Sequence, residues 1–216
     1  TKTPTVNPEF DRHPWPTLEA QLVDTADEIA YNAHDIDDGL NSGLISLEDI
    51  EPLSIWQPHG PLRGFSFTDS QFVNLDSDQK RRQLVRFLIN CVATDLLEET
   101  AKRIEGLAIT DVDSVREAPE RVCGYSESIT GRVAELKGFL NTRLYKHPRL
   151  QEHSERARQI LTTLFESLET NTDLLPLKYR EMLQTEDCPI VVADYIAGMT
   201  DRYAEGLYDK LKGGQR

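Results

Sequence analysis

Apolar residues recur at steps of three and four along most of the chain, which is the spacing of an amphipathic α-helix. The stretch from Leu18 to Leu40 shows this spacing most clearly. Its apolar positions share one face of the helical wheel and are Leu22, Ala26, Ile29, Ala33, Ile36 and Leu40. The same pattern predicts helices over residues 77–107, 126–144, 150–175 and 177–183, a final long helix over 187–211, and a short capped helix near 46–49. Every strongly periodic segment is helical, so the sequence predicts an all-α fold.

Three segments lack this period. Residues 1–16 contain four prolines and are expected to form an irregular connector that leads into a helical part over residues 17–216. Residues 57–76 are broken by proline and glycine, and we expect their three phenylalanines to anchor the loop in the core rather than to bind a base. Residues 108–123 alternate in polarity, which predicts an extended linker or at most a short strand.

The helix predicted over Leu18 to Leu40 also has an acidic face. Asp27, Tyr31 and Asp35 lie at positions i, i+4 and i+8, with further aspartates in the same sector and no lysine or arginine. Like charges at this spacing repel, so the counter-charge is expected from outside the helix, as a divalent cation. The alternative is an ordinary solvated acidic face. Tyr31 argues against it, because its flat ring and hydroxyl suit a sugar or a base.

Composition narrows the class of protein. The formal net charge of −13 over 216 residues makes general affinity for nucleic-acid backbone unfavourable, since such affinity requires a basic face. The three cysteines form no Cys-x-x-Cys pair, and free thiols in a reducing cytoplasm are the simplest interpretation. No apolar run approaches the ~20 residues that a membrane-spanning helix needs. We therefore expect a cytoplasmic protein with no membrane partner.

Three stretches together resemble one known family. Ala26–Leu40 resembles the signature helix of the deoxyguanosine triphosphate triphosphohydrolase-like branch of the HD-domain phosphohydrolases. Glu135–Leu140 with Leu144–Pro148, and then Ala193–Ala204, resemble further parts of that family in the same order. The resemblance implies an HD-domain-like helical bundle that hydrolyses a deoxynucleoside triphosphate to a deoxynucleoside and inorganic triphosphate. It also implies a divalent metal ion, Mg²⁺ or Mn²⁺, and a homo-oligomer.

The resemblance also implies roles for individual residues. Asp27 matches the final aspartate of the family's metal site. Tyr31 and Asp35 match the positions that hold the deoxyribose, with the carboxylate accepting from a sugar hydroxyl. Lys137 falls where relatives place a basic group toward the phosphates, and Tyr145 falls where they place an aromatic ring near the nucleoside.

One part of the family pattern is missing. The family's first metal-binding histidine, its His-Asp doublet and a catalytic His/Glu-rich segment precede the signature helix, and nothing here matches them. His34-Asp35 is a His-Asp dipeptide, but it lacks the flank of the true doublet. The chain therefore resembles the C-terminal part of the enzyme, without the N-terminal helices of the HD core. We expect it to contain no catalytic residue that the resemblance can assign and to be inactive by itself.

Two other functions remain open from the sequence. The helical chain could be a non-catalytic module for oligomerisation or nucleotide binding. Alternatively, Asp35-x-Asp37-Asp38 could form an aspartate-rich magnesium-diphosphate site like that of helical prenyl-transfer enzymes. The second alternative is less favoured, because no second aspartate-rich helix is present to face the first.

Overall fold

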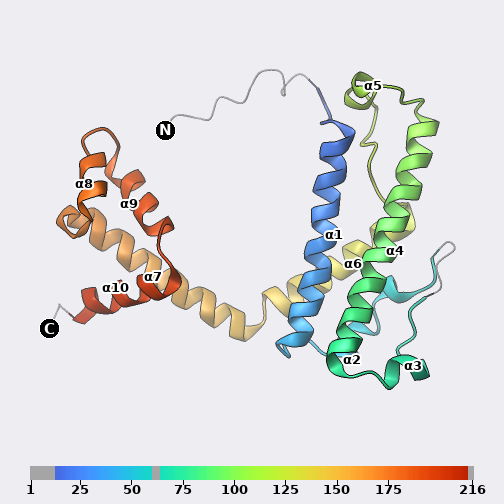
Figure 1. Ribbon diagram of the computed structural model, residues 1–216, viewed down its shortest axis with the longest axis horizontal. Coiled ribbons are helices and arrows are strands. Elements are labelled where there is room, and N and C mark those ends of the chain that lie inside the picture. Colours follow the sequence, from blue (N-terminus) through green and yellow to red (C-terminus); the bar gives the residue numbers. More distant parts are fainter. Residues whose placement is uncertain (1–12, 60–63, 214–216) are drawn as a thin grey trace. The chain divides into compact units, whose positions relative to one another are not determined.

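The computed structural model describes residues 13–59 and 64–213, and these residues form helices and no β-strand (Figure 1). The all-α prediction is therefore confirmed. The chain divides into two compact units, Thr1–His147 and Pro148–Arg216. Most of the connector predicted for residues 1–16 lies outside the described residues. Within its described end, the indole N–H of Trp15 donates a hydrogen bond to the Ala118 carbonyl at 3.0 Å.

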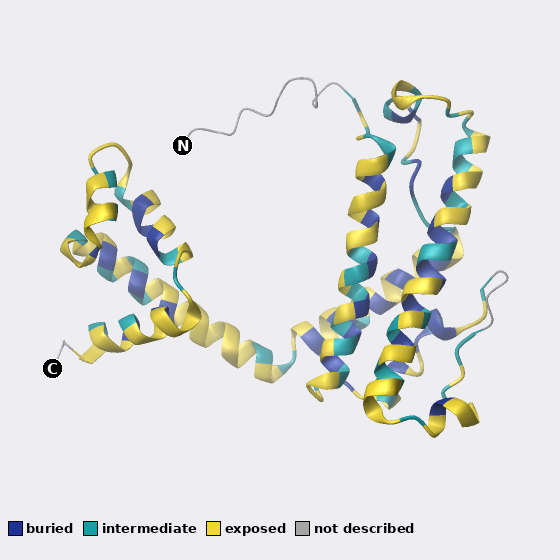
Figure 2. Ribbon diagram, viewed as in Figure 1, coloured by how far each residue is buried: buried dark blue, intermediate teal, exposed yellow. Residues whose placement is uncertain are grey.

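The first unit is built on two long helices that pack against each other, α1 (Leu18–Asn41) and α4 (Ser77–Gly106). Figure 2 shows their buried residues on the sides where the two helices face each other. Both helices begin with a side-chain cap, from Thr17 in α1 and from Asp76 in α4. The other elements of this unit are α2 (Leu47–Ile50), η2 (Ser54–Trp56), α3 (Ser70–Val73), α5 (Val112–Arg116), α6 (Glu127–Phe139) and the π-helical segment η3 (Leu140–Tyr145).

The buried face of α1 is only partly the predicted one. Its central residues are buried as expected, at Ile29, Ala33 and Ile36. Nearer the N-terminus, however, the buried residues are Gln21 and Thr25, whereas the apolar residues next to them, at positions 22 and 26, are exposed. The Gln21 side chain donates to the Pro16 carbonyl at 2.9 Å and accepts from the Cys123 backbone N–H at 3.0 Å. These two hydrogen bonds satisfy the polar atoms of the Gln21 amide, so its burial leaves no unpaired donor or acceptor at these contacts.

The phenylalanines of the loop over residues 57–76 pack into an aromatic cluster with Trp56 and Phe87. Ring centroids in this cluster lie 4.9–5.9 Å apart, and each of these pairs is edge-to-face or tilted. Phe72, on the single-turn helix α3, is buried. The loop is thus anchored in the core, as predicted.

Two segments differ from the sequence predictions. Residues 108–123 contain the short helix α5 rather than a strand, because the Asp111 and Ser114 side chains form a capping box that starts a helical turn. The helix predicted over 187–211 is two helices, α9 (Cys188–Ala197) and α10 (Asp201–Gly213). The break follows Gly198, and the Thr200 hydroxyl then accepts from the Tyr203 N–H to begin α10.

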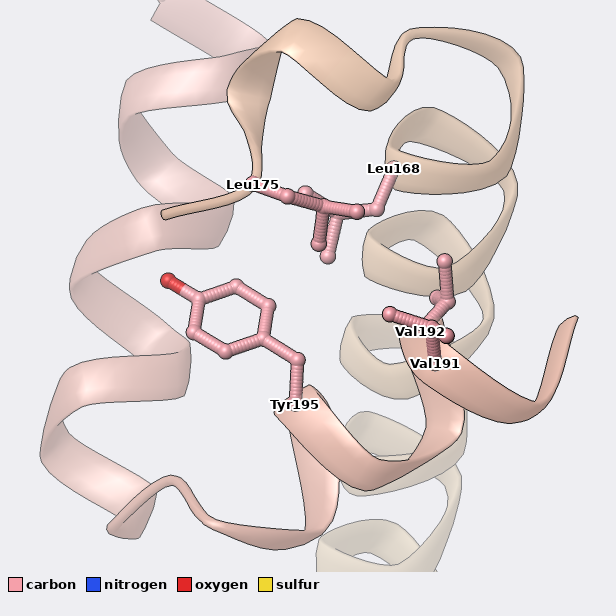
Figure 3. Close-up of a cluster of buried hydrophobic side chains, with 5 residues drawn as sticks. All are labelled: Leu168, Leu175, Val191, Val192 and Tyr195. Carbon is pink, nitrogen blue, oxygen red and sulfur yellow. The ribbon is translucent and has the colours of Figure 1, made fainter. Parts of the chain in front are cut away.

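The second unit contains α7 (Pro148–Thr170), against which both α9 and α10 pack. The elements η4 (Thr172–Leu174) and α8 (Leu177–Met182) connect α7 to α9. Figure 3 shows the core where these elements meet, formed by Leu168, Leu175, Val191, Val192 and Tyr195. A second buried cluster joins α7 to α10, at Ile160, Leu164, Ala204 and Tyr208. Among the described helices, none is both long and apolar enough to cross a membrane.

Candidate functional site

The acidic face of α1 points away from the buried stripe of that helix. Asp27 is exposed, Tyr31 is 64% exposed, and Asp35 is half-buried. Since these residues lie four positions apart, they follow one line along the helix surface. The structure therefore presents the three residues together on one accessible face.

Two residues predicted from a distant part of the sequence meet this face. The Tyr145 hydroxyl donates a hydrogen bond to Asp35 Oδ2, although the two residues are 110 positions apart. Lys137 Nζ lies 3.0 Å from Oε2 of Glu28, the residue after Asp27. The segment α6–η3 thus forms a wall beside α1, and the five predicted site residues lie along these two elements.

The π-helical segment explains why Lys137 and Tyr145 both reach α1. In a regular α-helix, residues eight positions apart differ by about 80° around the axis. The i→i+5 turns of η3 are wider, so each residue of this segment advances by a smaller angle. Tyr145 is thereby brought back toward the side on which Lys137 lies.

Burial and the Asp35 carboxylate widen the pH range over which the Tyr145 phenol stays protonated, because they raise its pKa. Burial, together with the hydrogen bond to the Asp35 carboxylate and its charge, raises the pKa of Tyr145 to about 12. The hydroxyl is therefore a donor at neutral pH. A carboxylate has two acceptor oxygens, so Asp35 can hold Tyr145 with one and accept from a ligand hydroxyl with the other.

The counter-charge for much of the acidic helix comes from the protein itself. Arg121 Nη2 lies 2.7 Å from Asp24, Lys137 pairs with Glu28, and Arg81 Nε lies 3.0 Å from Asp37. The expectation that an external cation supplies this charge was therefore wrong for Asp24, a member of the predicted face. The helical pattern could not reveal these partners, because all of them come from other elements. Within the described residues, Asp27 has no basic partner.

The described residues do not complete a metal site. Within residues 13–59 and 64–213, no group of three histidine, cysteine or carboxylate side chains is placed to hold an ion. His34 is exposed and lies about 100° around the helix from Asp35, so the dipeptide does not act as one pair of ligands. In the alternative Asp35-x-Asp37-Asp38 motif, Asp35 faces Tyr145 whereas Asp37 faces Arg81, so these two carboxylates do not converge.

A polar cavity of about 270 Å³ adjoins this face. Its lining includes Asp24, Glu28, Arg103, Arg121 and Tyr125. No pattern in the sequence singles out Arg121 or Tyr125, and the only signal for Glu28 is its position four residues after Asp24. A larger open groove, of about 600 Å³, lies elsewhere along α4 and does not include the predicted site residues.

One known protein family matches part of the chain. Residues 123–210 match the phosphohydrolase-associated domain family, which covers α6, η3 and most of the second unit. The cysteines, including Cys123 at the start of this match, are free thiols.

Comparison with whole proteins is more specific. The chain is 41% identical over 196 residues to the deoxyguanosinetriphosphate triphosphohydrolase-like protein of Azoarcus sp. (strain BH72), which covers 91% of this chain and 50% of that protein. It is 37% identical over 196 residues to the protein of the same name from Geobacter sulfurreducens, with the same coverage. For that of Nitrosomonas europaea the identity is 40% over 195 residues, covering 90% and 50%. The chain is thus homologous to deoxyguanosinetriphosphate triphosphohydrolase-like proteins and spans about half their length.

Proposed function

We propose that this chain forms the nucleoside-binding part of a deoxynucleoside triphosphate triphosphohydrolase. The observation that carries the proposal is the hydrogen bond between Asp35 and Tyr145. It joins two predicted nucleoside-binding residues that are 110 positions apart in the sequence. The homology to triphosphohydrolase-like proteins supports the same substrate class. The complete enzyme would convert a deoxynucleoside triphosphate to a deoxynucleoside and inorganic triphosphate.

The residues on the α1 face suit a deoxyribose. The exposed ring of Tyr31 offers a flat apolar surface, and Asp35 has a carboxylate oxygen to accept from a sugar hydroxyl. A ring packed under the sugar leaves little space for a 2′-hydroxyl, which provides a physical route to preferring deoxynucleotides. Tyr145 and Lys137 would line the same site from α6 and η3.

Metal chemistry belongs to the complete protein. A divalent ion, Mg²⁺ or Mn²⁺, would polarise a phosphate group and activate water. Asp27 is the one ligand that we assign to it among the described residues. With a single ligand the site does not fit a catalytic ion, so we expect this part of the protein to bind nucleotide without hydrolysing it.

Calorimetric titration with deoxyguanosine triphosphate tests the binding role. Asp35→Asn should weaken binding about tenfold or more, because a hydrogen bond to a charged carboxylate is lost. Asp209→Asn on α10 is the matched control, with the same change in net charge on an exposed helix of the second unit. Equal affinities for the two variants, with unchanged helicity, would remove Asp35 from the site.

Phosphorus NMR tests the incomplete metal site separately. With manganese and each deoxynucleoside triphosphate, this chain should release no inorganic triphosphate. Release at a rate above the protein-free control would contradict the proposal that this chain is inactive by itself.

An apolar groove favours a second candidate function, assembly of several copies. It lies on the second unit, has a volume of about 540 Å³, and is lined by Leu161, Phe165 and Ile196. Light scattering after size-exclusion chromatography tests this. A nucleotide-independent oligomer that binds no nucleotide would favour an oligomerisation module, and a monomer would exclude it.

A further inference from the structure

The open groove along α4 is lined by apolar and basic side chains together. It has a volume of about 600 Å³ and lies apart from the predicted site residues. Its lining comes from α4 except for one residue of α1, and consists of Asp37, Arg82, Val85, Arg86, Ile89, Asn90 and Ala93. The α4 members recur mostly at steps of three and four, and none of them belongs to the buried stripe of that helix. They therefore form one accessible line along α4.

The apolar part of this line is long enough to hold a helix. Val85, Ile89 and Ala93 lie at steps of four, and Ile89 is 37% exposed. Leu97 continues the line one turn further and is 61% exposed. From Arg82 to Leu97 the line covers about four helical turns, or ~22 Å. Rows of residues at this spacing leave a groove that accepts the side-chain ridge of another helix.

Two arginines at one end of the groove have no acidic partner. Arg82 and Arg86 are exposed, and neither forms an ion pair or a hydrogen bond with the part of the chain that the structure describes. Asp37, the one acidic residue of the lining, is already paired with Arg81, whose Nε lies 3.0 Å away. The chain has 37 acidic residues against 24 lysines and arginines, so carboxylates are in excess. The two guanidinium groups thus remain available for acidic groups from elsewhere.

Charge and shape together narrow what can occupy the groove. The net charge of −13 opposes binding of nucleic acid, which carries a long row of phosphates. A small anion would pair with the arginines but leave the apolar line in water. A helix with apolar residues on one face and carboxylates beside them would satisfy both parts of the groove.

We propose that this groove binds an acidic amphipathic α-helix of another protein chain. Apolar side chains of the partner helix lie over Val85, Ile89 and Ala93, and its carboxylates pair with Arg82 and Arg86. Because these side chains already line an open groove, binding requires no separation of α1 from α4. The inference is independent of the proposed nucleotide site.

Fluorescence anisotropy of a labelled synthetic helix, titrated with the whole chain, tests the proposal. The peptide has about 15 residues, the length that covers the line along α4, with leucines at steps of three and four and glutamates beside them in its first two turns. A second peptide carries lysines in place of the glutamates. The acidic peptide should bind about tenfold more tightly, because the lysines repel the two arginines. Its affinity should fall as salt is added.

Two variants separate the charged contact from the apolar contact. Arg86→Glu should weaken binding of the acidic peptide about fivefold, because an attraction becomes a repulsion. Arg202→Glu, at an exposed position of α10, is the control with the same change in net charge. Ile89→Ser should also weaken binding about fivefold, because less apolar surface is buried. Its control is Ile190→Ser on α9, where the isoleucine is 46% exposed.

The proposal is wrong if the acidic and lysine peptides bind equally, if each variant equals its control, or if no binding of the acidic peptide is detected. An oligothymidine that binds more tightly than the acidic peptide would assign the groove to nucleic acid instead. Light scattering gives one further outcome. A dimer that Arg86→Glu dissociates and Arg202→Glu does not would assign the groove to a second copy of this chain.

Discussion

Replacing Gln21 by alanine should destabilise the first unit strongly, although glutamine is polar and lies near a helix end. Gln21 is 1% exposed and joins α1 to two other segments, through the Pro16 carbonyl and the Cys123 N–H. In the variant the buried Cys123 N–H loses its acceptor, at a cost of about 1–3 kcal/mol, and the lost donor to Pro16 adds about 0.5–1.5 kcal/mol. The free energy of unfolding should therefore fall by about 2–4 kcal/mol.

Urea denaturation followed by tryptophan fluorescence measures this change in the free energy of unfolding of the first unit. The chain has two tryptophans, Trp15 and Trp56, and both lie in the first unit. The control is Gln83→Ala, at an exposed position of α4. Because alanine favours helix slightly more than glutamine, the control should change stability by less than about 0.5 kcal/mol. A loss below about 1 kcal/mol for Gln21→Ala, or one equal to the control, would refute the hydrogen-bond argument.

Two further predictions concern glycine and tyrosine. Gly39→Ala should destabilise the first unit by about 1–3 kcal/mol, because its β-carbon would lie 2.8 Å from Ile45 Cδ1. Gly138→Ala has open space and should stabilise α6 by up to about 1 kcal/mol in the same urea assay; the opposite order would contradict the contact. In a spectrophotometric titration, Tyr145 should ionise near its raised pKa of about 12, so the stability that it contributes is lost as the pH rises from about 10 through that value. Asp35→Asn should shift this transition to lower pH by removing the adjacent charge, and an unmoved transition would exclude the hydrogen bond in solution.

The sequence predicted where the helices lie better than which other segments each helix contacts. The apolar period located α1 and its central buried residues, because that information is local. It misplaced the N-terminal end of the stripe, because the burial of Gln21 depends on a residue 102 positions away. The break between α9 and α10 was missed for a different reason. The apolar period continues across it, and the stop depends on Gly198 and Thr200.

The residues of the candidate site also differ in how far local sequence could predict them. Asp27, Tyr31 and Asp35 follow from spacing on one helix, whereas the placement of Lys137 and Tyr145 came only from the family resemblance. The contacts that join these elements arise from tertiary packing over more than 100 positions. Arg121 and Tyr125 carried no sequence signal, since they lie in a segment without a regular period.

The π-helical segment also affects how related sequences should be aligned. A π-turn holds one more residue than the α-turn that it replaces, so a relative that is one residue shorter between Leu140 and Tyr145 could retain a continuous helix. Its tyrosine would then follow the lysine by seven α-helical positions, about 20° from it around the axis, and so would face α1 from the same side as Tyr145 does here. A single-residue gap at this point would therefore preserve the wall beside α1, and an alignment should place the gap within residues 140–145 so that the two tyrosines stay paired.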